Sequence, residues 1–273
     1  MNLRRPIPRR LAAFTLVEVM ISMTIVTLVL ALCLSTYLFT LRVMYKDTQR
    51  LATNAALRSF MAQVSKETLD ASYFYVLPYY TALDGSVDLT ADPAPMTQIL
   101  NAADDDYDKW VAHGDCLVLI TMTSQYRTTD IRQIRIYYRL VTTQESPTGN
   151  PPYTDRNHEA AIRYYESPDW GEGSAASSNG HSNLVSELNA INLNTYPADN
   201  RTRQLVGRSI GRQVPAPYTP FAAGDRYPVF SSESPNATAT NGFIAINMEI
   251  VNGSTINNLL SSSSFNYTVS PRR

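Results

Sequence analysis

The sequence predicts an α+β protein in which one long N-terminal helix carries an antiparallel β-sheet head. Three observations support this prediction. Residues 14–77 contain neither proline nor glycine, residues 19–41 carry no formal charge, and after Pro78 short β-rich runs alternate with Pro, Gly, Ser and Asn. A chain of 273 residues is long enough for one membrane segment and one domain with a real core. We expect four segments: a basic leader at 1–13, a transmembrane helix at 14–41, an amphipathic continuation of the helix at 42–77, and a β-rich head with long loops at 78–273.

The first segment holds a disproportionate share of the positive charge. Arg4, Arg5, Arg9 and Arg10 lie within the first ten residues, whereas the whole chain has a formal net charge of -1. Without residues 1–13 the chain keeps 19 basic and 24 acidic side chains, a net charge of -5. A body of that charge has no general attraction for nucleic acid or for anionic lipid.

The uncharged run is long enough to cross a bilayer. Residues 19–41 would form a helix on the order of 35 Å long, slightly more than the hydrocarbon core. Because the basic cluster precedes the run, the start of the chain is expected in the cytoplasm and the remainder outside. Cys33 lies within the run and Cys116 far beyond it, so we expect neither a disulfide between them nor a metal site.

Other interpretations of this terminus explain less. The apolar region of a secretory signal peptide is usually shorter, about 7–15 residues. A lipoprotein signal needs a small residue before the cysteine, but Leu32 precedes Cys33. A plain signal anchor fits the hydropathy and leaves Glu18 unexplained, although an acidic side chain in a spanning helix costs roughly 2.5–3.5 kcal/mol.

The residues around Glu18 carry a resemblance to a known family. The stretch RRLAAFTLVE at residues 9–18 resembles the prepilin leader and cleavage site of type IV pilins and type II secretion pseudopilins. The resemblance implies that a membrane peptidase cuts between Ala13 and Phe14 and then methylates the new amino group of Phe14. Glu18 would be the acidic residue at the fifth mature position. The family usually has glycine before the cut; Ala13 is also small, so we expect cleavage, at a lower rate.

Elementary electrostatics supports the same arrangement. Cleavage before Phe14 would create an amine one helical turn before Glu18, and this amine stays cationic near neutral pH. In an assembly, one subunit's amine could neutralise its neighbour's carboxylate inside an apolar core and so specify the register. Many family members carry a proline near mature position 22, where this chain has Ser35, so a kink in the helix is not expected.

The head is predicted from period-two patterns. In Ile131–Val141, for example, Ile134 and Ile136 face one side and Arg135 and Tyr137 the other. Expected strands are Cys116–Met122, Ile131–Val141, Ala161–Tyr165, Gly242–Val251 and Ser264–Val269. Their order is similar to that of J-type pseudopilins and allied minor pilins. Long loops are expected at Thr142–Glu159, Glu166–Ser182 and Gln213–Asn241, either as surface insertions or as a display surface for a partner.

Catalysis and cofactor binding have little support. His113, His158 and His181 lie in polar, loop-like contexts, and none belongs to a nucleophile or HExxH pattern. No glycine-rich phosphate loop is present. We therefore expect neither enzyme activity nor a cofactor.

A calcium site is a weak candidate. Asp104, Asp106 and Asp108 alternate like the opening of an EF-hand loop. The sixth position is Lys109 instead of glycine and the twelfth is Asp115 instead of glutamate, so a solvated acidic turn is the favoured interpretation.

Nucleic-acid binding is the remaining alternative for the head. Arginine and aromatic side chains are suited to phosphate and base contacts. The candidates are Arg201, Arg203, Arg208 and Arg212, together with Arg135 and Arg139, which alternate with tyrosines. The negative body argues against this partner, and a solvated strand face explains the same residues.

We therefore expect a minor pilin or pseudopilin, a structural subunit of a type IV pilus or of a type II secretion pseudopilus that acts in assembly initiation or at the tip. The helix would lie in the bacterial inner membrane, with the head in the periplasm, before assembly. Expected partners are other pilins or pseudopilins through helix packing, the prepilin peptidase/methyltransferase and inner-membrane lipid. The alternatives are a single-pass anchored envelope protein, and a minor pilin whose head binds DNA or a surface ligand.

Overall fold

The computed structural model describes residues 15–78, 97–99, 109–122, 131–140, 159–170, 202–214, 224–234, 243–253 and 259–269. These residues form one helix and ten strands. The elements are α1 (Leu16–Asp70), β1 (Tyr73–Leu77), β2 (Thr97–Ile99), β3 (Lys109–Gly114), β4 (Cys116–Met122), β5 (Ile131–Leu140), β6 (Ala160–Glu166), β7 (Thr202–Gly211), β8 (Phe230–Ser234), β9 (Phe243–Gly253) and β10 (Leu259–Val269). The predicted α+β class is confirmed.

The chain divides into two compact units, Met1–Thr48 and Gln49–Arg273. The first unit contains the N-terminal part of α1, which is continuous because no proline or glycine interrupts it. Three of its hydroxyl groups are satisfied within the helix: those of Ser22, Thr36 and Thr40 donate to the backbone carbonyl four residues earlier, at 2.7–2.9 Å. Such bonds let serine and threonine reside in an otherwise apolar helix.

In the second unit, the last turns of α1 pack on the sheet. Side chains that recur at intervals of three or four residues form a buried stripe on one helical face. The stripe consists of Thr53, Leu57, Phe60, Met61, Val64 and Thr68. The ring of Phe60 meets that of Tyr137 on β5 edge-on, with centroids 6.0 Å apart and planes at 79°. Within the segment predicted as the amphipathic continuation, residues 53–68 therefore cover one face of the head's sheet.

The helix ends at Asp70, whereas the segment assigned to its continuation extended to residue 77. Residues 73–77 form β1 instead, which pairs with β4 along its whole length. The run Tyr-Phe-Tyr-Val-Leu is aromatic and β-branched, and such side chains pack better on a pleated sheet than in a helix. Ser72 begins the pairing by donating its backbone N–H to the carbonyl of Ile120 at 2.8 Å.

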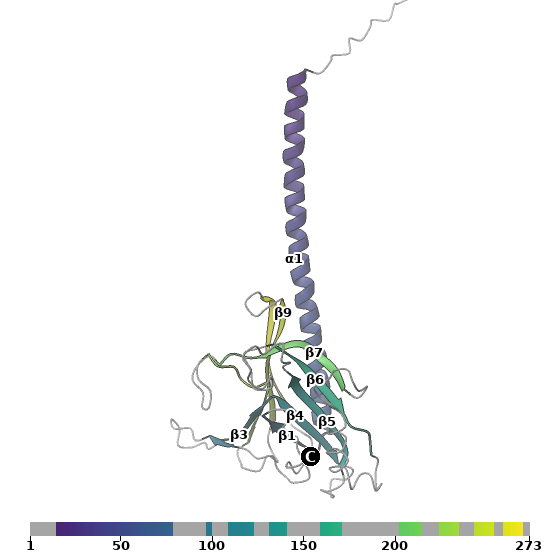
Figure 1. Cartoon of the computed structure of the whole chain (residues 1–273), viewed down its shortest axis with the longest axis vertical. Helices are drawn as coiled ribbons and strands as arrows, with labels where there is room; N and C mark the ends of the chain where they lie inside the picture. Colours follow the sequence, from purple (N-terminus) through teal and green to yellow (C-terminus); the bar gives the residue numbers. More distant parts are fainter. Residues whose placement is uncertain are drawn as a thin grey trace, which may run out of the picture. The chain divides into compact units, whose positions relative to one another are not determined.

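Every described strand pair is antiparallel, as predicted. The order is β1-β4-β5-β6-β7-β9-β8-β3-β2, and β10 also pairs with β9. Figure 1 shows β4, β5, β6 and β7 next to one another. β9 is the branching strand, because it pairs with β8 through residues 243–246, with β7 through residues 248–250 and with β10 along nearly its full length.

The chain bends between β3 and β4. Gly114 and Asp115 form the junction, and the backbone N–H of Asp115 donates to the carbonyl of Pro78 at 3.1 Å. A Cβ atom on Gly114 would lie 1.7 Å from the carbonyl oxygen of Leu77. Only glycine therefore allows the end of β3 to approach the end of β1 this closely.

Both faces of the central strands are buried. One face joins the cluster under α1, which includes Leu117, Leu119 and Tyr137, and the other joins a second cluster with Ile134 and Ile136. The predicted alternation of β5 is confirmed. Its second face, however, was interpreted as solvated, and this is wrong because α1 covers it.

Several boundaries differ from the prediction. Strand β7 and the shorter strands β1, β2, β3 and β8 were not predicted. The expected loop Gln213–Asn241 contains β8 and a bridge between Gln213 and Arg226. Of the loop expected at Thr142–Glu159 only Glu159 is described, and of Glu166–Ser182 only residues 166–170.

Candidate membrane-anchoring and assembly site

The first turn of α1 contains a capping box formed by Thr15 and Glu18. The carboxylate oxygen Oε2 of Glu18 accepts hydrogen bonds from the backbone N–H of Thr15 at 3.0 Å and from its hydroxyl group at 3.1 Å. In return, the hydroxyl oxygen of Thr15 accepts from the backbone N–H of Glu18 at 3.3 Å. This reciprocal arrangement satisfies backbone donors that a helix start leaves without partners. Glu18 therefore stabilises the beginning of the helix, and Ala13 and Phe14 lie outside the described residues.

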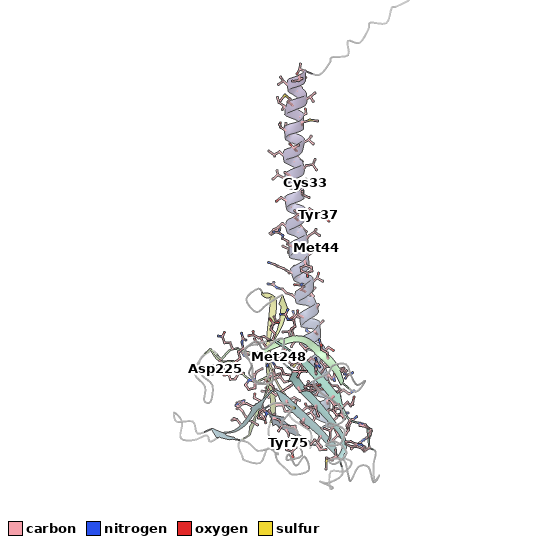
Figure 2. All side chains as sticks on the ribbon, viewed as in Figure 1. Cys33, Tyr37, Met44, Tyr75, Asp225 and Met248 are labelled. Carbon is pink, nitrogen blue, oxygen red and sulfur yellow. The ribbon has the colours of Figure 1, made fainter. Side chains whose placement is uncertain are left out.

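The helical part of the first unit presents apolar side chains to its surroundings on all sides. Large apolar residues between Leu16 and Tyr45 are 41–76% exposed. Figure 2 shows Cys33, Tyr37 and Met44 along this part of α1. A helix that is apolar all round is normally buried in a membrane or among other helices. By length and composition α1 is able to cross a membrane, and none of its most apolar window is buried within the chain.

Comparison with protein families bears directly on this helix. Residues 8–34 match the family described as the prokaryotic N-terminal methylation motif. The match supports assignment to the type IV pilin and pseudopilin family. Together with the apolar helix it supports a pilin-like, single-pass, membrane-anchored subunit. No curated protein and no solved structure matches the chain.

The motif also bears on processing and assembly. Proteins with this motif are processed by a prepilin peptidase and assembled with other pilins, and members of the family are generally structural. The motif ends at residue 34, so it concerns the N-terminal part of the helix and not the head.

In the head, the structure describes only one of the acidic residues considered for calcium, Asp115. Asp104, Asp106 and Asp108 lie outside the described residues. Asp115, the proposed twelfth position of the loop, is buried at the β3–β4 junction. Its Oδ1 accepts from the backbone N–H of Val229 at 3.0 Å, and its Oδ2 lies 3.5 Å from Nη1 of Arg139. Asp115 is therefore committed to an internal ion pair. Within the described ranges no three His, Cys, Asp or Glu side chains are grouped to hold a metal.

Of the six arginines considered for nucleic acid, two lie inside the head, Arg135 and Arg139. The side chain of Arg139 is 1% exposed and Arg135 lies under α1, so a solvated strand face was the wrong interpretation for both. Arg203 lies over the ring of Tyr164, 4.6 Å from its centroid. Arg208 forms an ion pair with Glu159. Arg212 is exposed, and Arg201 lies outside the described residues.

The remaining residues considered in the sequence are three histidines and two cysteines. His113 lies in β3, not in a loop, while His158 and His181 are outside the described residues. Cys33 is exposed and Cys116 is buried, and neither forms a disulfide. Burial, and then the adjacent carboxylate of Asp115, raises the pKa of the Cys116 thiol far above its ordinary value.

One polar cluster was not predicted from the sequence. The carboxylate of Glu67 on α1 accepts hydrogen bonds from the hydroxyl groups of Tyr137 at 2.5 Å and Tyr164 at 3.1 Å, and from the side-chain amide of Gln63 at 3.0 Å. Nε of Arg135 lies 3.9 Å from the same carboxylate. We call these five residues the Glu67 cluster. The sequence did contain one indication of this cluster. Glu67 follows Val64 by three positions, which places an acidic side chain beside the buried stripe.

The Glu67 cluster holds the two tyrosines in their protonated form. Burial, and then the charge of Glu67, raises the pKa of both Tyr137 and Tyr164 well above the usual range. Both phenols are therefore hydrogen-bond donors at any physiological pH. The cluster joins α1, β5 and β6 by charge-assisted hydrogen bonds.

Proposed function

We propose that this chain is a minor pilin or pseudopilin, which enters a type IV pilus or a type II secretion pseudopilus through its N-terminal helix and acts at initiation or at the tip. The observation that carries the proposal is the apolar helix α1, which begins within the matched methylation motif and is capped by Thr15 and Glu18. Its apolar side chains between Leu16 and Tyr45 are exposed. Lipid would cover such an apolar surface before assembly, and neighbouring helices would cover it afterwards.

The proposed processing step is cleavage between Ala13 and Phe14, followed by methylation of the Phe14 amine. The motif match spans this bond, and the helix begins at Leu16, shortly after it. The four leader arginines would hold the start of the chain in the cytoplasm until the cut, with the head in the periplasm. Removal of the leader would leave a cationic amine four residues before Glu18.

In the proposed assembly, the amine of one subunit pairs with the Glu18 carboxylate of its neighbour. Before assembly the same carboxylate caps its own helix through Thr15. The capping bonds reduce the cost of holding Glu18 at an apolar boundary, and the neighbour's amine would then supply the counter-charge. A minor position is proposed because a head of about 200 residues is bulky for a subunit repeated along a fibre.

The first experiment determines the mature terminus. Intact-mass and N-terminal peptide analysis of the membrane fraction is expected to give a chain that begins at N-methylated Phe14. Retention of Met1, or a cut beyond Cys33, would sink the proposal and favour a plain anchor or a cleaved signal.

The second experiment separates the charge of Glu18 from its capping role. Glu18→Gln keeps a side chain that can close the capping box but removes the charge, and Thr15→Ala removes the capping hydroxyl but keeps the charge. Breaking one half of a buried ion pair costs about 3–5 kcal/mol, so Glu18→Ala is expected to enter fibres at least about tenfold less often. Glu18→Gln should be intermediate, Thr15→Ala close to wild type, and membrane insertion unchanged in all three.

The readout is the fraction of this protein in sheared fibres relative to the membrane pool. Normal incorporation of Glu18→Ala would show that the carboxylate is incidental to assembly. An equal loss with Thr15→Ala would show that capping, not charge pairing, is what assembly requires.

A further inference from the structure

Two basic side chains lie immediately after the apolar run of α1. Arg42 and Lys46 are four residues apart, so they share one face of the helix. Both are exposed, and among the described residues neither makes a hydrogen bond or an ion pair. They therefore form an exposed, unneutralised pair of positive charges, which we call the Arg42–Lys46 pair.

Aromatic side chains accompany the pair on both sides of the end of the run. Tyr37 and Tyr45 are each 60% exposed. Figure 2 labels Tyr37 on the helix, between Cys33 and Met44. Tyrosine is enriched where a spanning helix meets the polar boundary of the bilayer, because its ring is apolar and its hydroxyl group is wet. Tyrosines next to lysine and arginine at this position are independent evidence for a headgroup layer.

The length of the helix places the pair at that boundary. The uncharged residues 19–41 span on the order of 35 Å, against a hydrocarbon core of about 30 Å. The polar headgroup region adds about 5–7 Å on each side. Arg42 would therefore lie at the inner edge of the headgroups, and Lys46 about 6 Å further out.

We propose that Arg42 and Lys46 bind the phosphate groups of anionic glycerophospholipids in the membrane leaflet that faces the head. This inference rests on the proposed membrane anchoring of α1. The net charge of -5 on residues 14–273 does not prevent the contact, because charges more than about 8–10 Å away are screened at physiological salt. Each basic side chain close to an anionic surface contributes about fivefold to its partitioning.

The lipid contact would fix how deeply the helix sits. Both side chains are long enough to extend along the helix to the headgroups while their methylene groups stay in apolar surroundings. The pair would thus hold the helix at one depth before assembly. Extraction into a fibre would require these contacts to be released.

The test uses the full-length protein reconstituted in phosphatidylcholine vesicles with and without phosphatidylglycerol. Spin-labelled phosphatidylglycerol and phosphatidylcholine measure the relative association of each lipid with the protein. The wild type is expected to prefer the anionic lipid about fivefold or more, and Arg42→Gln with Lys46→Gln should bring this ratio close to one. Arg58→Gln is the matched control, because Arg58 is also exposed on α1 but lies sixteen residues beyond Arg42. The wild-type preference should also vanish near 1 M salt, where the Debye length is about 3 Å.

Three results would overturn the inference: no preference in the wild type, the same loss in Arg58→Gln, or a preserved preference in the double variant. If the double variant kept its lipid preference but lost cross-links to neighbouring subunits, the pair would be a protein interface. Resistance to alkaline carbonate extraction tests anchoring separately. A chain that resists extraction but shows no lipid preference refutes only this inference, whereas a chain that is extracted refutes the proposed anchoring itself.

Discussion

Replacement of Glu67 by alanine should strongly destabilise the head. The carboxylate accepts hydrogen bonds from two tyrosine hydroxyl groups and lies beside Arg135, and its side chain is only 12% exposed. A hydrogen bond to a charged group contributes about 1.5–3 kcal/mol. Loss of both tyrosine bonds, which are not fully additive, should lower the free energy of unfolding by about 3–4 kcal/mol. For a domain of this size, that corresponds to a fall of about 6–15 °C in Tm.

The assay is urea unfolding of the full-length protein in detergent, followed by tryptophan fluorescence and near-ultraviolet circular dichroism. The midpoint should fall while the slope with urea stays constant, because the change affects stability and not the area that unfolding exposes. Lys66→Ala is the control: it truncates an exposed neighbour on the same helix and should change stability by less than about 0.5 kcal/mol. Glu67→Gln should fall between the two, because it keeps acceptor capacity without the charge.

A combined variant tests the reason for the loss. Glu67→Leu with Tyr137→Phe and Tyr164→Phe replaces the acceptor and both donors by apolar groups, and such complete replacement is often nearly neutral. Its stability should therefore exceed that of Glu67→Ala. The reasoning would be refuted if Glu67→Ala lost less than about 1 kcal/mol, or if the combined variant were no more stable than the single one.

Three further predictions follow from the same structure. Gly114→Ala should cost about 3 kcal/mol or more in thermal melts, because its Cβ would lie 1.7 Å from the carbonyl oxygen of Leu77. Gly207→Ala, whose Cβ would meet only the flexible end of a glutamine side chain at 3.2 Å, should change stability by about 0.5 kcal/mol or less, and equal losses would contradict the close-approach argument. The pKa values of Tyr137 and Tyr164 are raised by burial and by a neighbouring carboxylate, so above about pH 10 only the unfolded state ionises and stability should fall. Replacing both tyrosines by phenylalanine should flatten that decline, and a decline of unchanged steepness would show that other groups cause it. A fragment from residue 42 onward should be soluble and monomeric and should melt at the same temperature with and without chelator or reductant; a fall of several degrees with chelator would restore the calcium hypothesis.

The features that the sequence predicted well depend on near neighbours along the chain. The continuous helix, its apolar run and the strands at residues 116–122 and 131–140 follow from period, propensity and the absence of breakers, all of which act over a few residues. The Thr15–Glu18 capping box was not predicted, although its two partners are three residues apart and their order is a known start signal. Short strands such as β3 and β8 were missed because they are held by pairing with each other and with β9, not by their own pattern.

The amino-acid sequence by itself therefore predicted a long N-terminal helix that is apolar enough to cross a membrane, followed by an antiparallel head. Only the tertiary structure decided which charges are internal. Glu67 meets Tyr137 across 70 positions of sequence, and Asp115 meets Arg139 across 24. A sequence pattern shows that a side chain is charged, but whether it is solvated or paired depends on what the fold places opposite it. The packing of α1 on the sheet places Glu67 beside Arg135, and the β3–β4 junction places Asp115 beside Arg139, so these two arginines lie inside the head.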